Sequence, residues 1–383
     1  MLGVASDFRF AEREGHQDLM VERNGPLAGI RVVEIDAIGP VPLAAMLLAD
    51  LGADIVRIAR PPGKGAWDDV GGQILHRSRD VAYLNLKDVN ERKQLLQLID
   101  GADALIEGFR PGVVERLGIG PEVCLARNPR LVVGRMTGWG QWGPLAPWAG
   151  HDINYISITG ALHAMGNGKG PPPVPLNLVG DYGGGAMFLI AGLLAAILSA
   201  QRTGKGQVVD VCITDGVSSL MSLFYAWQPK GLWRDKPGAN LLDGAAPFYR
   251  CYRCADGRDV AVGCLEPQFF AQMVKGLGLQ DRGYDQNDRG GWPAMEADFR
   301  AAFASRTRDE WAAHFAETDA CVTPVLSMAE AAEHPHNKAR QSFVRRDGII
   351  QPAPAPRTLG TPPAICEARE TSIVEAIARW RRG

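Results

Sequence analysis

Features that would place the protein in a special structural class are scarce in its sequence. The longest apolar run, residues 186–200, has 15 residues, fewer than the about 20 that a membrane-spanning helix needs. Residues 1–24 contain no apolar segment typical of a signal peptide. Seven cysteines in 383 residues, an odd number, do not indicate a disulfide framework. We therefore expect a soluble, cytoplasmic protein with reduced thiols.

An excess of charge of either sign is also missing. The 41 Lys and Arg residues nearly balance 43 Asp and Glu residues, which leaves a formal net charge of −2. This balance argues against a protein whose main partner is nucleic acid or an anionic membrane. Lysine is rare, with 9 residues against 32 arginines. A GC-rich genome explains such a bias, and arginine-lined phosphate sites are the alternative explanation.

The hydrophobic content of 46% is enough for a sizeable core, and the length suggests two or three domains. A β-branched run predicts a strand over 30–35, an apolar segment predicts a helix over 42–52, and a second strand is expected over 53–58. Strand, helix and strand in about 30 residues form a βαβ unit, which requires a parallel sheet. The pattern then recurs, so the first half of the chain is predicted to be an α/β domain.

A different texture begins near residue 247, where a hairpin around Ala255-Asp256-Gly257 and amphipathic helices predict a smaller α+β domain. Residues 226–246 have no hydrophobic period and are interpreted as a connector. The predicted organisation is a polar extension over 1–24, a large domain over 25–225 completed by 350–383, a linker over 226–246, a small domain over 247–335 and a return linker over 336–349.

Nucleotide and metal motifs are not found. The turn at Gly39-Pro40 lacks the G-x-G-x-x-G pattern, and its prolines remove backbone donors that a pyrophosphate needs. Cys251 and Cys254 form a lone C-x-x-C without a second pair at zinc spacing. The sequence therefore favours neither a dinucleotide enzyme nor a metal site.

Three segments carry candidate reactive groups. His151 and Asp152 are adjacent in a stretch of glycine and β-forming residues, and Glu266 follows a hydrophobic strand. Asp181 precedes an apolar helix whose start is marked by three glycines. An aspartate there is typical of a helix N-cap; alternatively, bare glycines leave N–H groups open to a developing anion.

Together with neighbouring strings, these segments resemble the class III CoA-transferase superfamily (CaiB/BaiF). Within it, GHDINY and GDYGGG resemble the α-methylacyl-CoA racemase branch. The resemblance runs in order from about residue 25 to 325. The matching strings are GPLAGIRVVEI, LLADLGADIVRI, DALIEGFRPGVVERLGIGP, RMTGWGQWGP, GHDINYISITG, PLNLVGDYGGGAMF, RTGKGQVVDV and VAVGCLEPQFF.

The resemblance implies roles for four residues. His151 and Asp181 correspond to the two catalytic bases of the racemases, and Glu266 to the glutamate that orients the histidine from the partner subunit. Asp152 corresponds to the nucleophile of the transferases, which forms an acyl anhydride and then a thioester with CoA.

It also implies a fold and a mode of substrate binding. The fold would be a Rossmann-like large domain with a parallel sheet plus a small α+β domain, in interlocked homodimers. Basic residues of the first sheet would hold the CoA phosphates, and Tyr249 would line the site. The residues that match are Arg57, Arg60, Arg110 and Arg116.

We therefore expect an isomerase of lipid metabolism that interconverts the 2R and 2S forms of 2-methyl-branched acyl-CoA thioesters. Neither a metal nor a separate cofactor is expected, because CoA is part of the substrate. A CoA-transferase with Asp152 as nucleophile is the alternative, and an inactive acyl-CoA-binding protein is a third. The racemases that this sequence resembles have a methionine-rich wall around the acyl chain. In the corresponding segment this sequence has Phe224, Tyr225 and Trp227, so it does not specify which acyl group is accepted.

Overall fold

The computed structural model describes residues 23–61 and 71–382, so most of the expected extension, residues 1–22, lies outside the described residues. The chain forms two compact units. The described residues of the first, the sheet unit, fall within 1–155, 177–217 and 353–383. The second, the aromatic unit, comprises 156–176 and 218–352. Each is described by itself.

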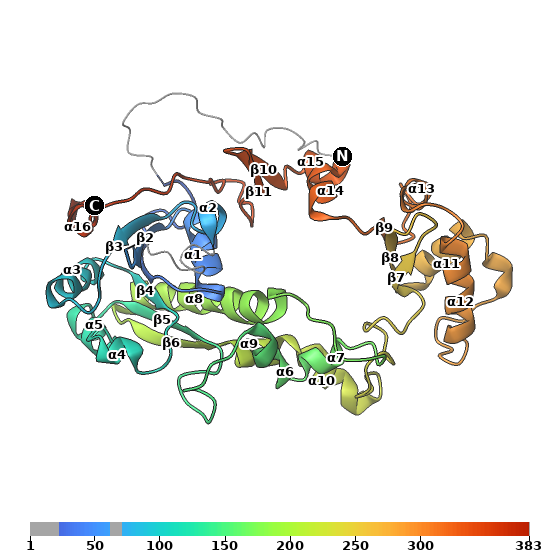
Figure 1. Ribbon diagram of the computed structural model, residues 1–383, viewed down its shortest axis with the longest axis horizontal. Coiled ribbons are helices and arrows are strands. Elements are labelled where there is room, and N and C mark those ends of the chain that lie inside the picture. The colour runs from blue at the N-terminus through green and yellow to red at the C-terminus, as the bar shows by residue number, and fades with distance from the viewer. Residues whose placement is uncertain (1–22, 62–70, 383) are drawn as a thin grey trace. The chain divides into compact units, whose positions relative to one another are not determined.

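The sheet unit is built on a six-stranded sheet (Figure 1). Every neighbouring pair of its strands is parallel, and the strand order is β3-β2-β1-β4-β5-β6. This is the order of a doubly wound Rossmann sheet, and it confirms the predicted α/β class. The strands are β1 (Arg31–Ile35), β2 (Asp54–Ala59), β3 (Asp80–Tyr83), β4 (Ala104–Glu107), β5 (Val132–Thr137) and β6 (Gln207–Cys212).

Helices cover both faces of this sheet (Figure 1). On one face, α3 (Val89–Ile99) and α16 (Ile373–Arg382) bury leucine, isoleucine and tryptophan side chains in the main core. On the other, α1 (Pro40–Asp50) and α8 (Met187–Thr203) pack against the strands and each other. The remaining helices of the unit are α2 (Gly72–Leu75), α4 (Val113–Arg116), α5 (Pro121–Arg127), α6 (Asp152–Ser157, which crosses the boundary), the π-helix η1 (Leu178–Ala186) and α9 (Ile213–Leu220, which also crosses it).

Helix α8 is part of a helical stretch longer than the apolar run of residues 186–200, and it is buried on one face only. It continues η1, so the helical stretch Leu178–Thr203 has 26 residues and is long and apolar enough to cross a membrane by length and composition alone. In this fold it packs against β5 and β6. Only one face is buried, however, because Met187 and Leu198 of the outer face are 42% and 54% exposed.

The sheet unit begins earlier than the predicted boundary at residue 25. The guanidinium of Arg23 lies 3.6 Å from Asp54 and 3.5 Å from Asp80, and it donates to the carbonyl of Ala53. The same two carboxylates accept from Arg379 of α16. The last residues of the expected extension therefore help to join the C-terminal helix to the sheet.

The aromatic unit contains a three-stranded antiparallel sheet of β7 (Tyr249–Arg253), β8 (Asp259–Gly263) and β9 (Val322–Pro324). The predicted hairpin is β7–β8. The core of the aromatic unit is rich in aromatic side chains, of which Phe299 and Phe303 are fully buried. The other elements are α7 (Ala161–Ala164), α10 (Ser222–Trp227), η2 (Gln228–Lys230), α11 (Pro267–Gly276), η3 (Gln280–Arg282), α12 (Trp292–Phe303), α13 (Arg308–His314), α14 (Met328–Glu333), α15 (Pro335–Ala339), β10 (Phe343–Arg346) and β11 (Ile349–Pro352).

Both segments predicted as linkers belong to this unit. In 226–246 the side chain of Asn240 is fully buried and donates to the carbonyls of Arg234 and Lys236. Residues 336–349 contribute most of α15 and all of β10. Neither segment has a hydrophobic period, because neither is stabilised by a buried helical face. Hydrogen bonds of the Asn240 amide hold the first segment, and the second contributes to the short β10–β11 hairpin.

Candidate active site

His151 and Asp152 lie at the start of α6 in the sheet unit. The N–H of His151 donates to the Asn154 side chain at 3.1 Å, and the His151 carbonyl accepts from the N–H of Asn154 at 2.8 Å. His151 is exposed, whereas Asp152 is only 7% exposed. Two adjacent ionisable residues therefore face different environments, and only the histidine is open to solvent.

Asp181 lies inside the π-helix η1 and not at the N-cap of an α-helix. The glycines that follow it are explained by packing. A Cβ at Gly184 would lie 2.6 Å from the side chain of Val217, and one at Gly185 would lie 3.0 Å from Pro40. Both glycines are buried, so their main effect is to let η1 approach α9 and α1. The N-cap interpretation is thus wrong, because helical geometry begins three residues before Asp181.

The carboxyl of Asp181 is held in a largely desolvated position. Burial and the negative charge of Asp152 raise its pKa to about 6. A hydrogen bond from the Asn177 side chain and the nearby His151 act in the opposite direction. Asp181 also faces the start of α1, where a Cβ at Gly39 would lie 3.2 Å from its Oδ2. The structure thus brings His151, Asp152 and Asp181 together.

Tyr155 completes this group and was not singled out from the sequence. Its ring contacts Trp139 edge-on, with 4.8 Å between centroids, and fills space that a Cβ at Gly138 or Gly150 would occupy. Its hydroxyl donates to the carbonyl of Gly150, the residue before His151. Burial is the main cause that raises the Tyr155 pKa to about 12. The phenol therefore stays protonated at neutral pH and anchors the chain beside His151.

A second residue that sequence reasoning missed is Asn177. It stands four residues before Asp181, a spacing that places two side chains on one face of a helix. Its amide donates to the Asp181 carboxylate. The spacing was visible in the sequence, but the helix that gives it meaning was expected to begin after the glycines.

The arginines predicted to hold phosphates are not equivalent. Arg57 is paired with Asp36 at 2.8 Å, and only 13% of its side chain is exposed. Arg60, Arg110 and Arg116 are exposed. Arg110 lies close enough to Tyr155 to lower the pKa of its phenol. Three of the four predicted cations are thus open to an anion, whereas Arg57 already has a carboxylate partner.

Glu266 and Tyr249 lie in the aromatic unit. Glu266 is exposed and precedes α11 without a side-chain capping bond. Tyr249 starts β7, opposite Gly263 of β8, and packs at the edge of the aromatic core. Neither residue is part of the group formed by His151, Asp152 and Asp181 within the sheet unit.

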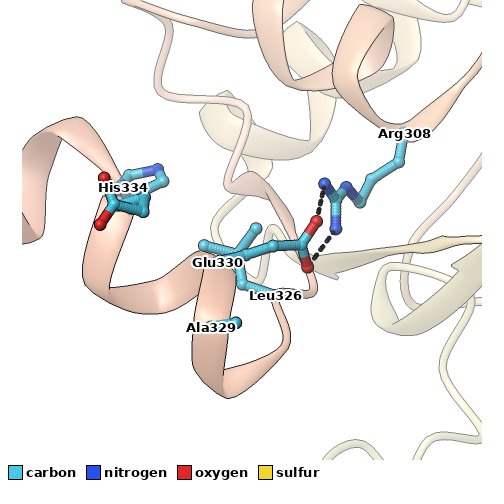
Figure 2. A pocket seen from close by; sticks show the side chains of 6 residues that line it. Arg308, Leu326, Ala329, Glu330 and His334 are labelled. Atoms are coloured by element: carbon cyan, nitrogen blue, oxygen red, sulfur yellow. Dashed lines mark hydrogen bonds and ion pairs between the residues drawn. The ribbon is translucent and has the colours of Figure 1, made fainter. Parts of the chain in front are cut away.

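An open hollow in the aromatic unit contains none of the predicted site residues (Figure 2). The guanidinium of Arg308 faces Glu330 and binds it at 2.7 and 3.1 Å, and it also donates to the carbonyl of Val325. These polar groups join α13 to α14, so Arg308 and Glu330 are already paired with each other. Within 23–61 and 71–382, no three His, Cys, Asp or Glu side chains are grouped to hold a metal.

Comparisons with known proteins agree with this geometry. The family description "CoA-transferase family III" matches residues 27–369. The chain belongs to CoA-transferase family III. The resemblance to the class III CoA-transferase superfamily is thus confirmed.

Relatives within the family include both of the activities considered from the sequence. The chain is 42% identical over 352 residues to α-methylacyl-CoA racemase of Mus musculus, covering 91% of each chain. It is 31% identical to acetyl-CoA:oxalate CoA-transferase of Acetobacter aceti, over 86% of this chain and 88% of that one. A solved CaiB/BaiF family protein from Brucella suis, 22% identical, matches with a TM-score of 0.79 over 94% of this chain and 99% of that one, which confirms the fold.

Proposed function

We propose that the protein is an isomerase that interconverts the 2R and 2S forms of 2-methyl-branched acyl-CoA thioesters, with His151 and Asp181 as its two bases. The similarity to the mouse racemase supports this assignment. The observation that carries it is the Asp181 carboxyl, which burial and Asp152 bring to a pKa of about 6 beside His151. A carboxyl that can carry a proton close to neutral pH, beside a histidine, supplies the acid and the base that a reversible transfer of protons requires.

The mechanism follows from the chemistry of a thioester. The carbonyl acidifies the α-hydrogen only moderately, so removing it needs a base at one face and stabilisation of the enolate oxygen. One of the two residues takes the proton, and the other, already protonated, returns one to the opposite face. Each residue thereby ends in the state in which its partner began. No cofactor takes part in this proposal, because CoA belongs to the substrate.

CoA itself would be held by charge. Exposed arginines suit a diphosphate because their fixed donors match its oxygens in pairs. We assign this role to Arg60, Arg110 and Arg116, with Arg57 contributing once it leaves Asp36. Tyr249 is proposed to line the site.

The proposal includes a homodimer in which Glu266 of one subunit orients His151 of the other. The exposed apolar face of α8, with Met187 and Leu198, supports an oligomer because such faces are normally covered. Coexpressed Glu266→Ala and His151→Ala subunits should regain part of the activity in mixed dimers, since one of their two sites is intact. Verified mixed dimers without activity would place each site within one chain. A role in lipid metabolism and a cytoplasmic location complete the proposal.

Incubation of a single enantiomer of a 2-methylacyl-CoA in D₂O tests the assignment. We expect loss of the α-hydrogen signal and formation of the other enantiomer without any acceptor acid. Transfer of CoA only when an acceptor acid is added would instead establish the transferase with Asp152 as nucleophile. Binding without either reaction would indicate a non-catalytic protein. In the same assay His163→Ala is the matched control for His151→Ala, because His163 is a half-exposed histidine that pairs with Asp235 in the aromatic unit.

A further inference from the structure

Asp152 is the one carboxylate of the candidate site whose role the two-base mechanism leaves open. We propose that Asp152 is a positioning residue of the isomerase: it ties the segment of His151 to the segment of Asp181 and holds its own carboxylate beside that of Asp181. It is not a nucleophile in this assignment. The inference rests on the proposed function and extends it.

The first part of the argument is geometric. Oδ2 of Asp152 accepts a hydrogen bond from the backbone N–H of Asp181 at 2.6 Å, and the backbone of Gly180 donates to the same carboxylate. N–H groups in the first turn of a helix have no partner within the helix. One side chain at the start of α6 therefore satisfies two such donors of η1, a segment 29 residues away.

The second part concerns access. A carboxylate that attacks a thioester needs an oxygen that the carbonyl carbon can reach. Oδ2 is engaged by the backbone, and Oδ1 is buried without a hydrogen-bond partner in the described part of the chain. The whole residue is 7% exposed. In this arrangement Asp152 holds the site together, and neither oxygen is presented to a substrate.

The third part is electrostatic. The groups that face Asp181 are His151, Asp152 and Tyr155 from the α6 segment and Asn177 from η1. Tyr155 is uncharged at neutral pH, and the start of α1 contributes no charged side chain. Among these groups, only the charge of Asp152 raises the pKa of Asp181, whereas His151 and Asn177 lower it. Removing that charge should lower the Asp181 pKa toward its ordinary value and reduce the fraction that holds a proton.

Asp152→Asn and Asp152→Ala test these two roles separately. The asparagine keeps an oxygen that accepts the N–H of Asp181 but loses the charge. We expect KM close to that of the wild type. In the direction in which Asp181 donates the proton, kcat at neutral pH should be lower by about tenfold, and the Asp181-dependent alkaline limb of the pH–rate profile should shift down by about one unit. The alanine also loses the hydrogen bonds, and misplacement of Asp181 should lower kcat by about 100-fold.

Asp103→Asn is the matched control, because Asp103 also accepts a backbone N–H, that of Arg31 at 2.8 Å, across a long stretch of chain. It lies away from the site residues and should leave kcat and the pH profile unchanged. An Asp152→Asn enzyme with the wild-type pH profile and kcat would overturn the proposal. So would an acyl group on Asp152 that hydroxylamine releases from the wild-type enzyme during turnover.

A readout without turnover separates this inference from the proposed function. In protein labelled with ¹³C at aspartate carboxyls, the Asp181 signal, assigned with Asp181→Asn, should titrate at lower pH in Asp152→Asn than in the wild type. If the wild type fails to exchange α-hydrogens but this shift is found, the isomerase assignment is wrong and the contact between Asp152 and Asp181 stands. An unshifted Asp181 in an active enzyme contradicts the role of Asp152 alone.

Discussion

The two units of the chain accommodate charge in opposite ways. The sheet unit contains buried arginine–carboxylate pairs. Arg79, just before β3, lies 2.5 Å from Glu34 of β1, and both side chains are 0% exposed. The aromatic unit buries rings such as Phe299 and Phe303 and carries many of its ion pairs near the surface, as between Arg253 and Asp259. Fully buried ion pairs are thus concentrated in the sheet unit, whereas the buried Arg308 of the aromatic unit pairs with a partly exposed Glu330.

This difference shows why the candidate chemistry lies where it does. In the sheet unit, Glu34, Asp50 and Glu107 each have an arginine partner within 2.9 Å. Asp152 and Asp181 are buried or half-buried but form no ion pair with an arginine or lysine of the described residues. Of the two, Asp181 has its pKa raised to about 6 by burial and by the charge of Asp152, so this carboxyl can carry a proton close to neutral pH.

The largest effect should come from removing either of the two proposed bases. His151→Ala and Asp181→Ala should each lower racemisation by about 10²–10⁴, the usual range for loss of a general acid or base. Exchange of the α-hydrogen should survive from one enantiomer in each variant, and from opposite enantiomers in the two. By analogy with the family, His151 would serve the S form and Asp181 the R form. Normal exchange from both enantiomers in both variants would refute the two-base assignment.

Breaking a buried pair should cost the next largest amount, this time in stability. Arg79→Met leaves the Glu34 carboxylate buried without its partner and should lower the free energy of unfolding by about 3–5 kcal/mol. The double variant Arg79→Met/Glu34→Leu should recover most of this loss, because an apolar pair needs no desolvation of charge. Urea unfolding of the single and double variants measures both effects, and a single variant as stable as the double one would contradict this account.

Asp181→Asn, which neutralises the carboxyl without a cation partner, should instead raise the free energy of unfolding. The folded pKa of Asp181, about 6, lies above the ordinary aspartate value of 3.8, so the unfolded chain loses this proton first as pH rises. Wild-type stability should therefore fall between pH 4 and 6 relative to Asp181→Asn. The full pKa difference corresponds to about 3 kcal/mol, and the partial exposure of the side chain reduces the expected gain at pH 7 to about 2 kcal/mol. Equal melting curves at pH 4 and pH 7 would show that Asp181 is not desolvated.

The smallest effect is expected at the surface of the aromatic unit. Arg253 is 66% exposed where it pairs with Asp259 across β7 and β8. Arg253→Gln should change the free energy of unfolding by about 0.2–1 kcal/mol, because solvent screens the pair. The change should shrink further in 0.5 M salt. A loss as large as that of Arg79→Met would remove the contrast between the two units.

Much of the sheet unit was predictable, whereas the aromatic unit was predictable only in part. The first βαβ segment combines a β-branched strand, an apolar helix and a glycine turn at Gly52 after α1, where φ is +101°. By contrast, the sequence predicts the amphipathic helices of the aromatic unit only as a group, without bounds for α12. It predicts a linker over 226–246, whereas the tertiary contacts of Asn240 show that this segment is packed.

The candidate site divides in the same way. His151, Asp152 and Asp181 were identified from the sequence through their motifs, but their environments were not. Three of these environments depend on contacts between separate parts of the chain. Asp152 binds the backbone of Asp181, Arg57 pairs with Asp36, and the Tyr155 ring fills the space beside Gly138. No periodicity or local motif encodes such contacts.

Sequence alone thus determined the alternation of strands and helices that requires a parallel sheet, the hairpin and the residue types available for chemistry. These depend on hydrogen bonds and apolar periods within a few residues of each other. The tertiary structure decided which of those residues are desolvated, which carboxylates have cations, and how close His151 lies to Asp181. Desolvation and Coulomb interactions act through space, so the pKa of Asp181 depends on Asp152, 29 residues away, more than on its own neighbours in the chain.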